Sequence, residues 1–231
     1  MVAIPASSFI MGSEASDEEK PPHKVSLSPY RICDHLVTNR EFALFLAADP
    51  RWSKDRVDPE LRGDHYLDDW IGDAYPEGKE DHPVAFVSHY VAAAFAQWLG
   101  KRLPTEAEWE CAARGGLVGK KFPNGDAMND KLANLAKQYR GTTPVKKFEP
   151  NGFMLYDMAG NLFEWCSDWY GPYPAGEARD PQGPAEGEYR VARGGSWMSG
   201  AGALRVSARV DMEETTCAQI GIRLADGGPS G

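Results

Sequence analysis

Glycine and proline together occupy 41 of the 231 positions in this chain, as 24 Gly and 17 Pro. Both residues interrupt helices and strands, so this content predicts many turns and few long regular elements. Aromatic residues make up 11% of the sequence, and seven of them are tryptophans. We therefore expect an α+β fold of short strands, two or three helices and much irregular chain around an aromatic core.

Three segments carry the start signals of helices. Thr38 and Glu41 can form a capping box, in which the threonine hydroxyl accepts from the Glu41 amide and the glutamate carboxylate accepts from the Thr38 amide. The same Thr-x-x-Glu pattern recurs at Thr105, and Ser88 is a suitable first residue for a helix that Gly100 would end. These signals predict helices near 38–48, 88–99 and 105–114.

The remaining segments are read as strands and loops. Residues 2–12 resemble a strand pair interrupted by Pro5, and residues 23–33 alternate apolar and polar side chains as a half-buried strand does. Residues 48–83 are polar, aromatic and acidic, which indicates a long loop with room for one short helix. No internal repeat or low-complexity linker divides the sequence, so we predict a single domain over 1–231.

Composition excludes several classes of protein. Hydrophobic residues at 42% and charged residues at 26% are typical of soluble globular domains. The net charge of −9 argues against a nucleic-acid partner, which rewards clustered Lys and Arg. No apolar run reaches the roughly 20 residues of a membrane span, and the N-terminus lacks the pattern of a signal peptide. A cytoplasmic protein is expected, although a chain whose leader had been removed for surface display would look the same.

Cysteine and histidine spacing gives no metal or redox motif. The five histidines form no HxH or HExxH pattern, so a zinc site is not predicted. The cysteines are too widely spaced for a short metal or redox motif, and we expect buried free thiols. They lie at positions 33, 111, 166 and 217.

Four segments, taken together, carry a family resemblance. They read GKRLPTEAEWE from Gly100, YDMAGNLFEW from Tyr156, RGGSW from Arg193 and GIRL from Gly221. In this combination the chain resembles the formylglycine-generating enzyme (sulfatase-modifying factor) family over nearly its whole length. The resemblance implies a C-type lectin-like fold of the formylglycine-generating-enzyme type.

In that family, the turn corresponding to residues 157–164 holds a structural calcium ion. Calcium takes about six to eight oxygen ligands, which carbonyls and carboxylates of a turn can supply. The alternative is that Glu164 only fixes the turn by accepting from backbone amides. A second calcium site of the family has only Asn134 and Leu135 as counterparts here, and we do not predict it. The ligands that the resemblance implies are Asp157, the carbonyls of Gly160 and Leu162, and the carboxylate of Glu164.

The reactive cysteines of the family are missing. In the family, one cysteine a few residues after the Gly-Gly-Ser-aromatic turn, and a second shortly after it, bind copper and carry out the oxidation. Here Ser199 takes the first position, and no cysteine lies between Gly194 and Thr216. Copper(I) prefers soft sulfur ligands to a hydroxyl, so no copper and no formylglycine formation are expected. Carboxylate neighbours such as 68–69 and 213–214 are most simply solvated pairs, so no other catalytic set is predicted.

Two C-terminal stretches of small and mixed residues lie between segments that should anchor in the core. Loops held in this way tolerate replacement and commonly bind ligands. The layout resembles the variable proteins of diversity-generating retroelements, in which a fold of this kind presents a variable C-terminal region to ligands. The predicted ligand-binding residues are Trp197, Met198, Ser199, Gly200, Ala201, Gly202, Ala203, Val210, Asp211, Met212, Glu213, Glu214, Thr215, Thr216 and Gln219.

We therefore predict a non-catalytic domain whose C-terminal surface binds a protein or another macromolecular ligand. The alternative is an oxidoreductase of the same family that uses a non-standard active site. A third interpretation is a decayed paralogue that acts as a scaffold beside an enzyme. The presence or absence of aldehyde product from a cysteine peptide separates the enzyme from the two binding interpretations.

Overall fold

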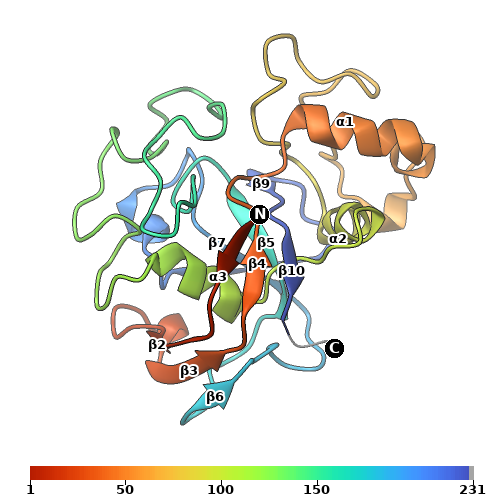
Figure 1. Cartoon of the computed structure of the whole chain (residues 1–231). Helices are drawn as coiled ribbons and strands as arrows, with labels where there is room; N and C mark the ends of the chain where they lie inside the picture. Colours follow the sequence, from red (N-terminus) through yellow and green to blue (C-terminus); the bar gives the residue numbers. More distant parts are fainter. Residues whose placement is uncertain (229–231) are drawn as a thin grey trace.

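The computed structural model describes residues 1–228 (Figure 1). Its helices and strands are short and much of the chain is irregular, which confirms the α+β class. Within this range no helix is long and apolar enough to cross a bilayer. The helices are α1 (Asn39–Ala48), α2 (His89–Trp98) and α3 (Glu106–Arg114), with 3₁₀ turns η1 (Asp17–Glu19), η2 (Pro50–Trp52), η3 (Pro59–Leu61) and η4 (Ala201–Leu204). The strands are β1 (Val2–Ile4), β2 (Ser7–Met11), β3 (His23–Leu27), β4 (Tyr30–Ile32), β5 (Phe163–Trp169), β6 (Ala178–Arg179), β7 (Arg190–Arg193), β8 (Arg209–Met212), β9 (Ile220–Gly221) and β10 (Ala225–Gly227).

The helices begin at the predicted capping residues. At α1, Glu41 N donates to Thr38 Oγ1 (3.3 Å) and Thr38 N donates to Glu41 Oε2 (2.8 Å). At α3, the same reciprocal pair joins Thr105 and Glu108. Helix α3 ends at Gly115, whose φ of 56° is left-handed and suits glycine. Each N-cap stabilises its helix by about 1 kcal/mol, so local sequence locates these helices well.

The irregular segment between α1 and α2 is held by aromatic packing. Phe42 and Phe45 of α1 lie 5.6 and 5.5 Å from Phe95 of α2, measured between ring centroids. Trp70, from the loop between the helices, lies 6.0 Å from Phe42. All four rings are buried, and each aromatic pair adds about 0.5–1.5 kcal/mol beyond the buried area. The predicted long loop therefore contributes to the core although it contains only the short turns η2 and η3 within residues 50–61.

Residues 23–33 form two strands rather than the one predicted. Pro29 lies between β3 and β4 and has no N–H to donate to a strand ladder. Strand β3 pairs antiparallel with β2, whereas β4 lies in another sheet between β1 and β10. Residues 2–12 do form two strands, β1 and β2, but these strands enter different sheets and do not pair with each other as predicted. Segments near the start and the end of the described residues meet in the sheet of β4, because Val2 and Ala225 are both register partners of Ile32.

A further sheet, in the order β8-β7-β5-β9, positions the C-terminal segments. Strand β5 pairs antiparallel with β7 and parallel with β9, so Glu164 lies opposite both Arg193 and Gly221. Helix α3 contacts β5 and β7 as well as β2 and β3. It is therefore the element that joins this sheet to the N-terminal one.

Candidate functional site: the C-terminal turns and the ion pairs beneath them

The backbone of the turn 157–164 has left-handed conformations that restrict which residues fit. Asp157 (φ 56°) and Gly160 (φ 78°) are both left-handed. Only glycine fits at position 160, because a Cβ there would lie 2.3 Å from the carbonyl oxygen of Asn134. Gly160 N donates to Gly194 O (2.8 Å). This hydrogen bond joins the 157–164 turn to the turn at Gly194 and Gly195 (the Gly-Gly turn).

Glu164 is fully buried and accepts three hydrogen bonds from side chains. Arg223 donates Nη2 to Oε1 and Nε to Oε2, and Trp109 donates Nε1 to Oε2, all at 2.7 Å. These donors are a guanidinium and an indole, rather than the backbone amides of the alternative considered above. Burial acts to lower the pKa of Arg223, but the charge of Glu164 outweighs it and the pKa of Arg223 is raised. Arg223 therefore stays charged and pairs with Glu164.

Asp157 has a different environment. It is buried, and its Oδ2 accepts from Lys146 N (2.9 Å). Burial raises the pKa of Asp157 to about 6, and the nearby charge of Glu164 also acts to raise it. A bound cation would stabilise such a carboxylate.

The two predicted carbonyl ligands accept no hydrogen bond. Within residues 1–228, no N–H donates to the carbonyl oxygens of Gly160 and Leu162. The side-chain oxygen of Asn134, whose carbonyl touches this turn, is also buried without a partner in the described chain. Glu164, by contrast, uses both carboxylate oxygens on its side-chain donors. The turn thus offers Asp157 and two carbonyls to a hard cation, while the same residues 1–228 contain no group of three or more His, Cys, Asp or Glu arranged to hold a metal.

The Gly-Gly turn has positive φ angles, 92° at Gly194 and 72° at Gly195, which glycine readily adopts. Ser199, at the position of the family's first cysteine, closes this turn with its hydroxyl. Ser196 N donates to Ser199 Oγ (3.0 Å), and the two serine hydroxyl oxygens are 3.3 Å apart. Trp197 is half-buried rather than part of the deep core. The local chemistry is that of a hydrogen-bonded turn.

The cysteines are free thiols, and Cys111, Cys166 and Cys217 are buried as predicted, whereas Cys33 is only half-buried. Cys217, the first cysteine after the motif, is buried in the aromatic cluster beside Tyr66, and burial raises the pKa of Cys217 to about 11. Burial also raises the pKa values of Cys33, Cys111 and Cys166. The thiolate is the reactive and metal-binding form, so these raised pKa values favour the neutral thiol at neutral pH.

The first predicted ligand-binding stretch, residues 197–203, packs on the loop that follows α3. Lys137 N donates to the carbonyl of Trp197 (2.6 Å), and Ala136 N donates to that of Ser199 (3.0 Å). Met198 is 45% exposed, and Gly200 and Gly202 also face solvent. Backbone bonds thus hold the stretch in place while Met198 projects outward.

The second stretch, residues 210–219, is only partly exposed. Asp211 and Glu213 face solvent, but Glu214 accepts from Tyr90 Oη (2.6 Å) and Arg190 Nε (2.9 Å). Burial acts to raise the pKa of Glu214, yet these two donors outweigh it and the pKa is lowered. The interpretation of 213–214 as a solvated pair is therefore wrong for Glu214, which has a structural role. Asp68 and Asp69 are exposed, as expected.

The two stretches meet at one point and diverge elsewhere. Trp197 Nε1 donates to Gln219 Oε1, which joins their ends. However, they leave opposite ends of the β7–β8 pair, because Arg193 pairs with Arg209 at one end and Arg190 with Met212 at the other. In Figure 1 the light-blue turn of η4 lies to the left, whereas the darker chain leading into β9 lies toward α2. A single compact face is thus formed around Trp197 and Gln219 only.

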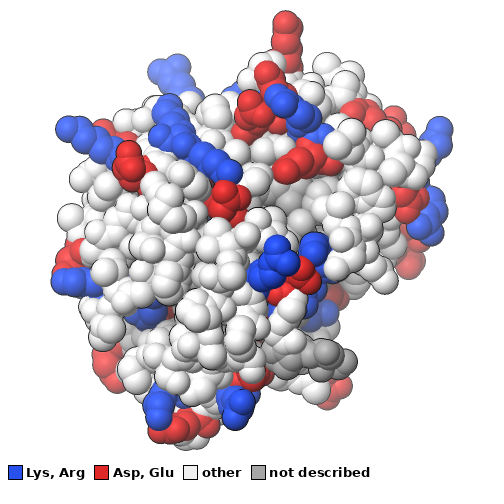
Figure 2. Space-filling model, viewed as in Figure 1, with Lys and Arg blue, Asp and Glu red and all other residues white. Residues whose placement is uncertain are grey.

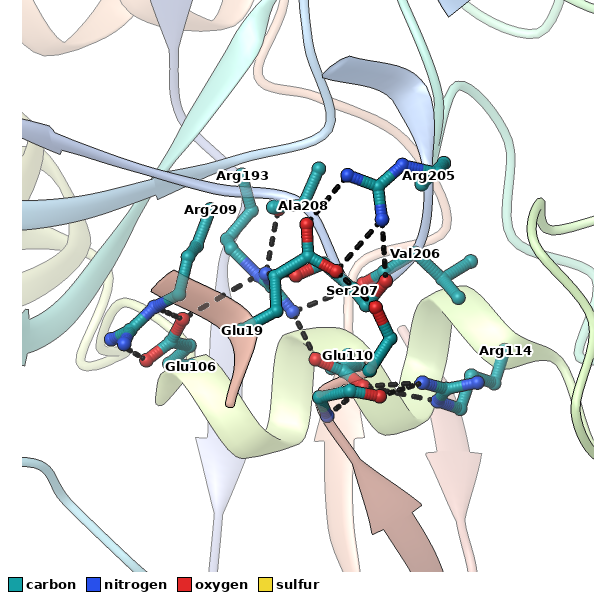
Figure 3. Close-up of polar contacts among 12 residues, drawn as sticks. Glu19, Glu106, Glu110, Arg114, Arg193, Arg205, Val206, Ser207, Ala208 and Arg209 are labelled. Atoms are coloured by element: carbon teal, nitrogen blue, oxygen red, sulfur yellow. Dashed lines mark hydrogen bonds and ion pairs between the residues drawn. The ribbon is translucent and has the colours of Figure 1, made fainter. Parts of the chain in front are cut away.

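Buried ion pairs fix the base of this region to α3 (Figure 3). Glu106 binds Arg209 through two bonds of 2.8 and 2.7 Å. Glu110, one helical turn later on the same face, pairs with Arg193 and with Arg114. Arg193 is fully buried, and charged Glu110 and Glu106 help to keep its pKa raised against the effect of burial. The acidic face of α3 thereby holds the strands from which both stretches extend.

Arg193 also shapes the segment between η4 and β8. Its guanidinium donates to the carbonyls of Val206, Ser207 and Ala208 at 3.0, 2.8 and 2.6 Å. Arg205 from the same segment pairs with Glu19 of η1. The carbonyls of residues 206–208 lie outside the strands and have no strand partner. The Arg193 guanidinium supplies the hydrogen-bond donors that a neighbouring strand would otherwise provide.

Asp168 is the most perturbed carboxyl near this network. It is buried, and Glu106 N donates to its Oδ2 (2.9 Å). Burial raises the pKa of Asp168 to about 7, and the charge of Glu106 adds to the shift. The side chain lines a small cavity with Tyr173 and Arg209.

Sequence reasoning did not identify these ion pairs. The available signal was the spacing of Glu106 and Glu110, which puts both carboxylates on one face of α3 beside the apolar Trp109. A charged pair on the inner face of a helix needs buried partners. The arginines of the Arg-Gly-Gly and Leu-Arg-Val-Ser-Ala-Arg segments supply them.

Comparison with known proteins agrees with these features. The family described as "Sulfatase-modifying factor enzyme 1-like domain" matches residues 1–227. A formylglycine-generating enzyme of Streptomyces coelicolor is 35% identical, and the match covers 97% of this chain and 88% of that protein. Among solved structures, Treponema denticola variable protein 1 superposes with a TM-score of 0.80 at 28% identity, covering 98% of this chain and 94% of that one.

A longer protein also contains a similar segment. The serine/threonine-protein kinase pkn1 of Chlamydia pneumoniae is 42% identical over 86% of this chain. The chain spans only 33% of the length of that kinase. The fold is thus shared by proteins named for quite different activities.

Proposed function

We propose that this chain, which belongs to the sulfatase-modifying factor enzyme 1-like domain family, is a non-catalytic, ligand-binding member with a C-type lectin-like fold. The observation that carries the proposal is Ser199. Its hydroxyl stands where the resemblance places the first reactive cysteine, and it is hydrogen-bonded to Ser196 within the turn. A hydroxyl is a weak, hard ligand where copper(I) needs thiolate sulfur. We expect no copper at this position.

The proposed ligand is a protein or another macromolecule, and the contact surface is centred on Trp197, Met198 and Gln219. The structural similarity to Treponema denticola variable protein 1 supports this class of function. A segment similar to this chain also forms one third of a longer protein named as a kinase, so domains of this kind occur within larger proteins. Charged residues of both signs are scattered over the face in Figure 2, so that face offers no one-sign patch to nucleic acid.

An oxidoreductase with a non-standard active site is the rival function, favoured by the 35% identity to a formylglycine-generating enzyme. The test is incubation with copper, oxygen and a sulfatase-type cysteine peptide, with aldehyde measured by mass spectrometry. The Streptomyces enzyme serves as the positive control. We expect aldehyde from the control and none from this chain. Aldehyde above the level of a protein-free reaction would support the enzyme.

We also propose a structural calcium ion in the turn, held by Asp157 and the carbonyls of Gly160 and Leu162. Support comes from the two carbonyls without hydrogen bonds and from the raised pKa of Asp157. Arg223 neutralises Glu164, so the turn presents the charge of one carboxylate to the ion. Few charged ligands mean low affinity, and a Kd of about 10⁻⁴–10⁻³ M is expected.

Thermal unfolding with added calcium or chelator tests this proposal. Calcium at 100 times Kd should stabilise the fold by about 2.7 kcal/mol, and chelator should lower the melting temperature of protein purified with calcium. Asp157→Ala should remove the calcium effect, whereas Asp211→Ala, an exposed carboxylate outside the turn, should retain it. An equal response in both variants would reject this site.

A further inference from the structure

We propose that the free edge of β2 is a second interaction site, which binds an extended acidic peptide segment as an added strand. The site is separate from the C-terminal surface, because the cavity along this edge is lined by neither 197–203 nor 210–219. A test of peptide binding at the β2 edge is therefore independent of a test of ligand binding at the C-terminal surface.

The shape of the cavity is the first support. A cavity of 720 Å³ lies between β2 and the chain that follows α3. One wall is the consecutive run 7–10 of β2, and another is the consecutive run 116–121. Side chains of a strand alternate between its two faces, so a cavity lined by every residue of a run follows the edge of that strand.

The backbone of this edge is unpaired. Strand β2 bonds to β3 along one side, from Ser7 opposite Leu27 to Met11 opposite His23. In the sheet β2-β3-β6, no strand within residues 1–228 pairs with its other side. An open edge presents N–H and C=O groups that an extended peptide can pair with, as in strand addition.

Apolar side chains flank the edge on both sides. Ile10 of β2 is 53% exposed, and Val118 on the opposite wall is 91% exposed. Phe9 and Phe153 line the floor and are half-buried. A strand added here would place alternate side chains against these groups, so alternating apolar residues are expected in the ligand.

The charge of the lining selects among peptides. Five basic residues and a single acidic residue, Glu14, line this cavity of the described chain, although the protein carries a net charge of −9. Four of the five basic residues are ion-paired within the chain, but their carboxylate partners are not part of the lining, and Lys121 has no ion pair among the described residues. The pairs are Lys24–Glu177, Arg114–Glu110, Lys120–Asp126 and Arg205–Glu19. The charged ends of these Lys and Arg side chains thus border the cavity and favour a peptide with acidic residues between its apolar ones. The basic lining residues are Lys24, Arg114, Lys120, Lys121 and Arg205.

The binding test uses a fluorescein-labelled octapeptide of alternating valine and glutamate, titrated with the full chain at low ionic strength and followed by anisotropy. We expect saturable binding that is at least about tenfold weaker for the peptide with lysine in place of glutamate, because the rim repels it. The valine–glutamate peptide with alternate amides N-methylated keeps the side chains but cannot form a ladder, and should not bind. Equal binding of the lysine or the methylated peptide would overturn the proposal.

The matched variants are Val118→Asp and Ile71→Asp, because Ile71 is 89% exposed but lies outside the cavity. Val118→Asp should weaken peptide binding at least about tenfold, through lost apolar contact and added like charge, and Ile71→Asp should not. Hydrogen exchange at amides 7–10 should slow when the peptide binds. Unchanged exchange, equal effects of the two variants, or displacement of the peptide by laurate, which would mark a small-amphiphile site, would each contradict strand addition.

Discussion

Replacement of Arg223 by methionine removes one half of the buried ion pair beneath the 157–164 turn. Arg223 and Glu164 are both fully buried, and the guanidinium donates two bonds to the carboxylate. Methionine would leave Glu164 charged with only the Trp109 indole as a side-chain donor. The carbonyls of Cys33 and Tyr156, which also accept from Arg223, would lose that donor.

Breaking one side of a buried pair costs about 3–5 kcal/mol, because the remaining charge is neither solvated nor neutralised. For a chain of this length, 1 kcal/mol corresponds to about 2–4 °C, so a fall in melting temperature of about 6–20 °C is expected. Urea unfolding measures the free energy directly, and an unchanged m-value shows that the same surface is exposed.

Two further variants test whether the loss of stability comes from the buried charge of Glu164. Glu164→Gln combined with Arg223→Met removes the stranded charge and should recover part of the lost stability. Arg51→Met removes an exposed arginine whose partner is Asp49, and the unfolding midpoint should not move. A loss below about 1 kcal/mol for Arg223→Met, or a double variant that is no more stable, would refute the reasoning from an uncompensated buried charge.

Asp168→Asn should flatten the dependence of stability on pH. Burial raises the folded pKa of Asp168 to about 7 from an ordinary 3.8. Asp168 therefore does not destabilise the fold below about pH 4, where it is protonated in both states, and it lowers the free energy of unfolding increasingly as the pH rises to 7. A difference of about 3 pKa units corresponds to about 4 kcal/mol, which urea unfolding of both proteins across this range would detect as a gain for the variant at high pH. Joint replacement of Met198 by serine, Ala201 by serine and Glu213 by glutamine should leave the melting temperature nearly unchanged, since each surface change costs within about 0.5 kcal/mol. Glu214→Gln should lower the melting temperature, because Arg190 loses its charged acceptor, and equal melting of the Glu213 and Glu214 variants would contradict this assignment.

The sequence alone determined the features that depend on near neighbours. A capping box joins residues three apart, so the starts of α1 and α3 were predictable from Thr38 and Thr105. The turn at Gly194 was predictable because glycine readily adopts positive φ. The missing thiol at Ser199 needed no structure either, since it is a matter of residue identity once the motif is aligned.

Only the tertiary structure decided which charges are buried and which edges are free. Glu164 meets Arg223 across 59 positions and Glu106 meets Arg209 across 103, and nothing in either local segment specifies the partner. The same holds for Glu214, which looked solvated in sequence but is paired with Arg190. Residues 23–33 were predicted as one strand, and only the structure shows that they form β3 and β4 in different sheets and that β2 lies at the edge of its own sheet. These outcomes depend on which distant segments pack together, because burial and hydrogen-bond pairing are properties of the assembled core and not of any short window of chain.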